Sequence, residues 1–144
     1  MSEITLLVSK NQIDSLIRST REDFPNESCS LLLGSIVDDE YHVKVLKKME
    51  NKAHSEYSFY MDPDELMKVY KWASDNGLDV IGVFHSHLEG SNPSDTDLTF
   101  MNINPVIWLI YDVSKSTYSA FLLVQDSLKE IKIKISKGEA SKCL

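Results

Sequence analysis

The segment from Val80 to Asp97 constrains the fold of this chain most, because its sequence predicts a strand, a loop and a helix in close succession. It opens with an apolar run that predicts a buried strand and continues into His85 and His87. Alternate side chains of a strand point to the same face, so the two histidines would project together. A loop rich in turn-forming residues then reaches Ser94, which with Asp97 three residues later has the pattern of a helix start. We therefore expect a strand, a loop and a helix that bring Asp97 back to the histidines.

Two imidazoles and one carboxylate make a donor set that suits zinc. Three protein ligands of this kind leave the fourth tetrahedral position of Zn²⁺ to water, which is the arrangement of a catalytic site. A single histidine at a strand end is more often a hydrogen-bonded core or surface residue, and Ser94 with Asp97 also fits an ordinary helix cap. The metal and capping interpretations are compatible, because a helix that starts at Ser94 would hold Asp97 toward His85 and His87.

The order of these residues resembles a known motif. His-x-His, a short loop and Pro-Ser-x-x-Asp are similar to the JAMM motif of the MPN-plus metalloproteases, which cleave ubiquitin and ubiquitin-like proteins from their targets. That family also carries an upstream glutamate in a segment like Glu-x-Cys-Gly-x-Leu-x-Gly, and Glu27 to Gly34 reads Glu-Ser-Cys-Ser-Leu-Leu-Leu-Gly. The resemblance extends from about Leu6 to Val124, and it points to standalone archaeal or bacterial deubiquitinase-like members.

The resemblance implies a role for each residue of the motif. It makes His85, His87 and Asp97 the ligands of one zinc ion per chain. It makes Glu27 the general base that takes a proton from the zinc-bound water, and it has Ser94 help to stabilise the oxyanion. The implied reaction is hydrolysis after the C-terminal Gly-Gly of ubiquitin or a ubiquitin-like modifier by a zinc-activated water. Without the resemblance, Glu27 would be an ordinary first-turn glutamate of a helix.

Two other functions remain open at this point. The first is a processing peptidase for a sulfur carrier protein. The second is a non-catalytic MPN scaffold whose site is vestigial or serves only binding. The intact glutamate, histidine pair, serine and aspartate favour an enzyme over a scaffold. Nucleotide deamination, on a related fold, requires His-x-Glu together with Pro-Cys-x-x-Cys, and that combination is absent from the sequence.

Composition limits the partners and the location. The formal net charge is −7 with an isoelectric point near 5.0, so nucleic-acid phosphates would meet net repulsion and we expect a protein partner instead. No apolar stretch approaches the roughly 20 residues that span a bilayer, and the N-terminus lacks the pattern of a signal peptide, so we expect a cytoplasmic protein without a membrane partner. Cys29 and Cys143 are far apart in the sequence and do not predict a disulfide framework. The oligomeric state is not determined by these features.

Length and periodicity predict one α/β domain over residues 1–144. We expect a curved mixed sheet flanked by helices, which agrees with the MPN fold that the resemblance implies, a fold related in shape to the cytidine deaminases. Helices are expected over Lys10–Glu22 from a Ser9 and Gln12 capping box, from Asp62-Pro63 to Asn76-Gly77, and from Ser94. Strands are expected at Ile4–Val8, Leu31–Val37, Tyr41–Met49, Tyr57–Met61, Val80–Phe84, Val106–Tyr111, Tyr118–Val124 and Leu128–Ile135.

Further features concern strand environment and substrate contact. The continuous apolar run Val106–Tyr111 predicts a central strand covered on both faces. Lysines that alternate with apolar residues in Leu128–Ile135 predict the solvent face of an edge strand. The resemblance places the extended terminus of a modifier beside the zinc, and we expect Asn51 to Ser58 and Leu88 to Asn92 to contact it.

Overall fold

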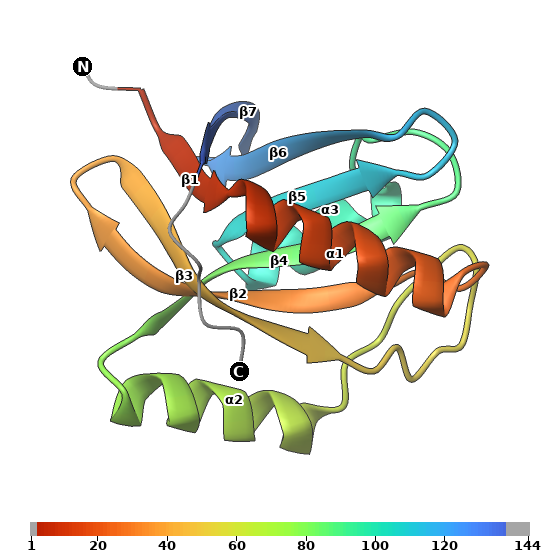
Figure 1. Cartoon of the computed structure of the whole chain (residues 1–144), viewed down its shortest axis with the longest axis horizontal. Helices are drawn as coiled ribbons and strands as arrows, with labels where there is room; N and C mark the ends of the chain where they lie inside the picture. The colour runs from red at the N-terminus through yellow and green to blue at the C-terminus, as the bar shows by residue number, and fades with distance from the viewer. Residues whose placement is uncertain (1–2, 138–144) are drawn as a thin grey trace.

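The computed structural model describes residues 3–137 of the chain. Within them, one mixed sheet of seven strands is surrounded by three helices (Figure 1). The elements in chain order are β1 (Thr5–Ser9), α1 (Lys10–Asp23), β2 (Cys29–Val37), β3 (Glu40–Met49), α2 (Pro63–Asp75), β4 (Asp79–His87), α3 (Asp95–Ile103), β5 (Ile107–Asp112), β6 (Thr117–Val124) and β7 (Ser127–Ser136).

The sheet closes into a barrel, which corrects the expected open sheet with an edge strand at its C-terminal end. The strand order is β1-β3-β2-β4-β5-β6-β7, and β7 also pairs in parallel with β1. The lysine alternation in β7 therefore does not mark an edge. The alternation reflects the two faces of β7. Ile131 is buried and Ile133 partly buried, whereas Lys132 and Lys134 are exposed. Alternation distinguishes the faces of a strand but carries no information on whether both its edges are paired.

The helix starts follow the local sequence signals. Ser9 Oγ accepts a hydrogen bond from the Gln12 backbone N–H at 3.1 Å, and Gln12 Oε1 accepts one from the Ser9 N–H at 2.9 Å, so the predicted capping box is confirmed. Asp62 caps α2, with Pro63 at its first turn. After α2 ends, Gly77 has a φ of 69°, a left-handed conformation that favours glycine. Short-range hydrogen bonds thus define where these helices begin and end.

The strand expected at Tyr57–Met61 is wrong, because this segment is irregular. Its backbone is bonded within the loop rather than by a neighbouring strand, and the Lys52 N–H donates to the Tyr60 carbonyl at 2.8 Å. Asn51 Nδ2 donates to the Ser58 carbonyl at 3.0 Å, and Asn51 Oδ1 accepts from the Tyr60 N–H at 3.1 Å. Within the segment, Phe59 is buried. The apolar pattern therefore records a loop that packs one aromatic ring into the core.

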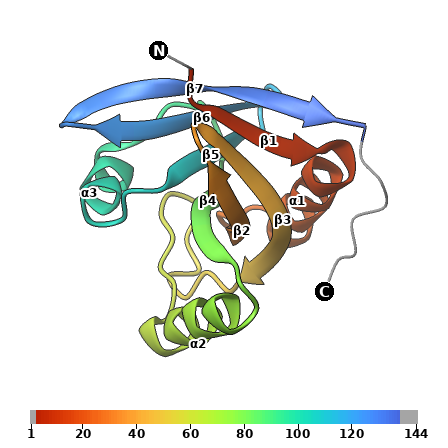
Figure 2. The same cartoon turned by 90° about the vertical axis from the view of Figure 1, so that its left-hand side faces the viewer.

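The core consists of two buried clusters. One includes Ile13 and Leu16 of α1, and the other includes Val69 of α2 and Met101 of α3. All six residues of β5 are buried, which confirms the predicted central strand. Tyr70 of α2 is exposed. In Figure 2, α2 lies on the side of the sheet away from β6 and β7.

Cys29 is a buried free thiol, and burial raises its pKa to about 12, so this thiol stays protonated at neutral pH. Cys143 lies outside the described residues. Among the helices of residues 3–137, none has the length and apolar character needed to cross a membrane.

Candidate metal centre

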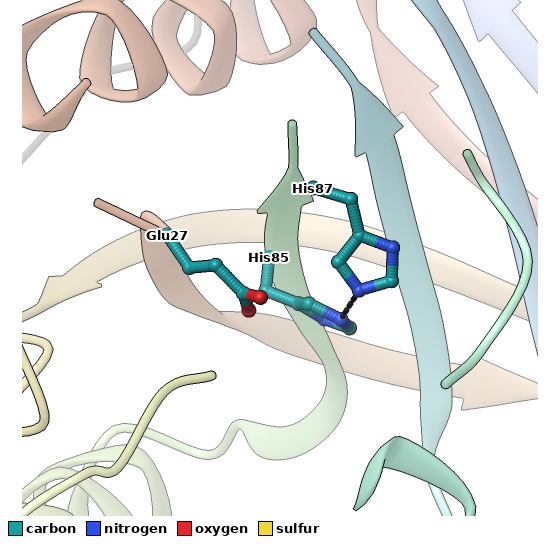
Figure 3. Close-up of side chains that lie close together, drawn as sticks. All are labelled: Glu27, His85 and His87. Atoms are coloured by element: carbon teal, nitrogen blue, oxygen red, sulfur yellow. Dashed lines mark hydrogen bonds between the residues drawn. The ribbon is translucent and has the colours of Figure 1, made fainter. Parts of the chain in front are cut away.

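Three segments that are far apart in the sequence meet at the end of β4. His85 and His87 are the last alternate residues of β4, and Asp97 lies in the first turn of α3. Glu27 precedes β2, which pairs with β4 so that Cys29 is opposite His85. The side chains of Glu27 and the two histidines point toward one another (Figure 3). The antiparallel pairing of β2 with β4 thus places the glutamate beside the histidine pair.

The two histidines and Asp97 form a compact triangle of potential ligand atoms. Asp97 Oδ2 lies 3.0 Å from His85 Nε2 and 3.1 Å from His87 Nε2, and the two Nε2 atoms are 2.9 Å apart. Ligand atoms around a tetrahedral zinc ion with bonds of about 2.0 to 2.1 Å are about 3.3 Å apart. Two neutral Nε2 lone pairs and one carboxylate oxygen at these distances can be accommodated around one cation with shifts of a few tenths of an ångström. The donor set and its spacing therefore fit a zinc ion.

The two rings are held in different ways. His87 Nδ1 lies 3.1 Å from the Gly90 carbonyl and donates to it, so Nε2 is the ring nitrogen that faces Asp97. His85 is completely buried, with ring centroids of Phe59 and Trp108 at 4.8 and 5.4 Å. No hydrogen bond to His85 Nδ1 occurs within the described part of the chain. Aromatic packing therefore orients His85, whereas a loop carbonyl orients His87.

The charge states of the two histidines also differ. Burial lowers the pKa of His85 and outweighs the opposing effect of Asp97. Burial acts in the same direction on His87, but its hydrogen bond to Asp97 and the nearby charges of Asp97 and Glu27 produce a net rise in its pKa. The buried ring of His85 is thus neutral, which is the form that binds a metal.

Asp97 belongs both to the helix cap and to the triangle. Its N–H donates to Ser94 Oγ at 3.1 Å, and its Oδ2 accepts from the Ser94 N–H at 2.9 Å, which confirms the predicted cap. Burial alone would raise the pKa of Asp97, but hydrogen bonds from His85 and His87 hold it well below its ordinary value. The carboxylate is therefore ionised, as a metal ligand must be.

Glu27 brings a second carboxyl group to the two histidines. Its side chain is buried, and its Oε1 has no hydrogen-bond partner among the residues described. Glu27, His85 and His87 each offer one ligand atom, and these atoms lie within 4.8 Å of one another. Burial raises the pKa of Glu27 to about 7, against the opposing influence of His87 and with a smaller contribution from Asp97 in the same direction. A carboxylate with this pKa can both accept and return a proton near neutral pH.

The structure brings Glu27, His85, His87 and Asp97 together, as the sequence predicts, and it places Ser94 at the N-terminus of α3. Other residues of the surroundings were missed. Phe59 and Trp108 contact His85, and Asn51 and Ser86 bond to the backbone around Glu27. An aromatic residue in an apolar run and an asparagine after a strand are too common to indicate such contacts. Only the folded chain identifies them.

Comparisons with known proteins agree with this architecture. The chain matches the family described as prokaryotic homologs of the JAB domain over residues 9–124. A relative from Pyrococcus furiosus named desampylase is 32% identical over 131 residues, which cover 90% of this chain and 89% of the relative. The solution structure of protein DSY2949 from Desulfitobacterium hafniense has a TM-score of 0.84 and 27% identity, and the match covers 94% of this chain and 95% of that one.

The fold and the cluster of histidines and carboxylates define a mixed α/β domain of the JAB/MPN class. The chain belongs to the family of prokaryotic homologs of the JAB domain. The resemblance read from its His-x-His and Pro-Ser-x-x-Asp motif is thereby confirmed.

Proposed function

We propose that this protein is a single-domain zinc isopeptidase that cleaves a ubiquitin-like modifier after its C-terminal Gly-Gly. The observation that carries the proposal is the triangle of His85 Nε2, His87 Nε2 and Asp97 Oδ2, with sides of 2.9 to 3.1 Å, beside the buried carboxylate of Glu27. The Pyrococcus furiosus relative supports the substrate class, because a desampylase removes a ubiquitin-like modifier from its conjugates.

His85, His87 and Asp97 would hold the zinc ion. Two nitrogens and one oxygen favour zinc over calcium or magnesium, which prefer oxygen ligands alone. When bound, zinc lowers the pKa of its water to about 7 and polarises the scissile carbonyl. Burial of His85 and Asp97 keeps bulk water away from these side chains and strengthens the electrostatic interactions of the site.

Glu27 acts as the general base in this proposal. Its carboxylate accepts a proton from the attacking water and passes it to the departing lysine amine. The pKa of about 7 supports this role, because neither the protonated nor the ionised form is strongly favoured at neutral pH. The lack of a hydrogen-bond partner on Oε1 within residues 3–137 leaves that atom available to a water or a substrate.

Ser94 stabilises the oxyanion in the same scheme. Its oxygen already accepts the Asp97 N–H as the helix cap. A hydroxyl has one donor proton in addition to its acceptor lone pairs, so Ser94 can cap α3 and still donate to a developing negative charge. The two roles predict different consequences when the residue is changed to alanine or to aspartate.

The terminus of the modifier would occupy the groove beside Glu27. A cavity of about 410 Å³ opens there, with Met49, Asn51 and His54 among its lining residues. Two of these residues belong to the Asn51 to Ser58 segment that was expected to contact the modifier. An extended Gly-Gly tail has no side chains to obstruct entry to such a groove.

The test is incubation of the purified protein with C-terminal fusions and lysine conjugates of several ubiquitin-like proteins, with chelator and with zinc restored. We expect cleavage after Gly-Gly that the chelator abolishes and zinc restores. Undiminished cleavage by the chelated protein would exclude the zinc mechanism. Cleavage of sulfur carrier fusions alone would favour a processing peptidase, and zinc binding without any cleavage would favour the scaffold.

A further inference from the structure

Asn51 lies two residues beyond the end of β3 and is buried. Its Nδ2 donates to the carbonyls of Glu27 and Ser58, both at 3.0 Å, and more distantly to the carbonyl of Ser55 at 3.5 Å. Its Oδ1 accepts from the N–H groups of Ala53 at 3.0 Å and Tyr60 at 3.1 Å. An amide side chain has two donor hydrogens and two acceptor lone pairs, so the four shorter bonds already use its full capacity. The loop that contains residues 51–60 is thus built around one side chain.

The same loop binds Glu27 a second time. The Glu27 N–H donates to the carbonyl of Ser55 at 2.8 Å, while the Glu27 carbonyl accepts from Asn51. On the other side, the Ser28 N–H donates to Ser86 Oγ at 2.8 Å, between the two histidines of β4. Both polar groups of the Glu27 backbone are therefore fixed by the loop, and the next residue is fixed to the histidine strand.

The side chain of Glu27 lacks a comparable anchor. Its Oε1 is buried and has no hydrogen-bond partner in the described residues. The direction of the carboxylate then depends on where its own backbone lies. Any displacement of that backbone is passed to the carboxylate, which must remain near His85 and His87. A misplacement of about 1 Å in an active site can cost on the order of 10²-fold in rate.

We propose that Asn51 is a positioning residue for Glu27. It sets the carboxylate by bonding to the Glu27 carbonyl and by shaping the loop that accepts the Glu27 N–H. This inference rests on the proposed function, because it assumes that Glu27 is the general base. If Asn51 only built the loop, its loss would lower stability or substrate affinity without acting through Glu27.

The main variant is Asn51→Ala, which removes every hydrogen bond of the amide and adds no charge. The matched control is Asn76→Ala, because the Asn76 side chain also donates to a carbonyl, that of Trp72 at 2.8 Å, at the exposed end of α2. We expect kcat for cleavage of a modifier fusion to fall about 10- to 100-fold in Asn51→Ala. We expect a smaller change in KM and an unchanged zinc content, because Asn51 makes no hydrogen bond to the ligand side chains. The control should keep the wild-type kcat.

A double-mutant cycle with Glu27→Gln separates positioning from other roles. If Asn51 acts through Glu27, adding Asn51→Ala to Glu27→Gln should change the residual rate by less than about twofold. A further loss as large as that in the wild-type background would overturn the inference. Near-wild-type activity of Glu27→Gln itself would instead overturn the proposed function.

Hydrogen exchange in the metal-free protein gives a readout independent of activity. We expect the Glu27 N–H to exchange at least tenfold faster in Asn51→Ala, and at the wild-type rate in Asn76→Ala. Wild-type protection of this amide in Asn51→Ala would overturn the inference. If Asn51→Ala does not fold, Asn51→Asp takes its place, because it retains an oxygen for the Ala53 and Tyr60 N–H groups but cannot donate to the Glu27 carbonyl.

Discussion

Replacing Glu27 by glutamine should stabilise the metal-free protein at high pH. Burial raises the pKa of this carboxyl from its ordinary value of 4.5 to about 7, with His87 opposing the rise and Asp97 adding to it. Between these two values the folded chain binds a proton that the unfolded chain has released. Wild-type stability therefore falls as the pH rises from about 4.5 to 7. Glutamine cannot ionise, so the variant escapes this loss.

The size of the effect follows from the same two values. Their difference, at about 1.36 kcal/mol per pH unit, sets a ceiling of about 3 kcal/mol. Glu27 borders the groove, where water screens the charge, so we expect about 1 to 2 kcal/mol. The stability of Glu27→Gln relative to wild type should increase by this amount between pH 5 and pH 8.

Urea unfolding with chelator present, followed by tryptophan fluorescence, measures this difference at both pH values. The buried Trp108 becomes exposed on unfolding and provides the signal. Glu22→Gln is the control for the loss of one carboxylate, because Glu22 is exposed near the end of α1. A Glu27→Gln difference that is the same at pH 5 and pH 8 would refute the argument that burial controls this carboxyl.

Other predictions concern the metal and the chemistry. The purified protein should contain about one zinc per chain by metal analysis, and His85→Ala and Asp97→Ala should lose it; retention in both variants would show that the ligand assignment is wrong. Glu27→Gln should keep zinc while kcat falls about 10²- to 10⁴-fold, as for loss of a general base, and near-normal turnover would contradict that role. Ser94→Ala should keep zinc and lose on the order of 10²-fold in turnover. Ser94→Asp should regain the roughly 1 kcal/mol of capping stability in thermal melts but stay inactive, since an ionised carboxylate repels an oxyanion; full activity in both variants would leave Ser94 as a cap only.

Local features of this protein could be predicted from the sequence because the interacting residues are close along the chain. The caps formed by Ser9 with Gln12 and by Ser94 with Asp97 each join residues three positions apart. The apolar run of β5 reports burial on both faces directly. The same short range explains why the strand, loop and helix around the histidines could be expected from the Val80 to Asp97 segment alone.

Where a pattern has more than one structural solution, the sequence led to errors. The residues at Tyr57–Met61 have the composition of a strand, but the Ser58 carbonyl and the Tyr60 N–H are bonded by Asn51 and the Tyr60 carbonyl by the Lys52 N–H, all within one loop. The alternation in β7 is equally compatible with an edge strand and with a strand paired on both sides. In each case the structure that forms depends on hydrogen-bond partners that lie elsewhere in the chain.

The sequence by itself determined the chemical groups of the site, the local elements that carry them and, through its motif, the family. Only the tertiary structure decided how those groups meet. Pairing of β2 with β4 places Glu27 beside His87, and pairing of β7 with β1 closes the barrel. Asn51 then fixes the Glu27 backbone across 24 positions of the sequence. Backbone pairing and amide hydrogen bonds are available to nearly every residue, so long-range partners are selected by the packing of the whole chain rather than by a local pattern.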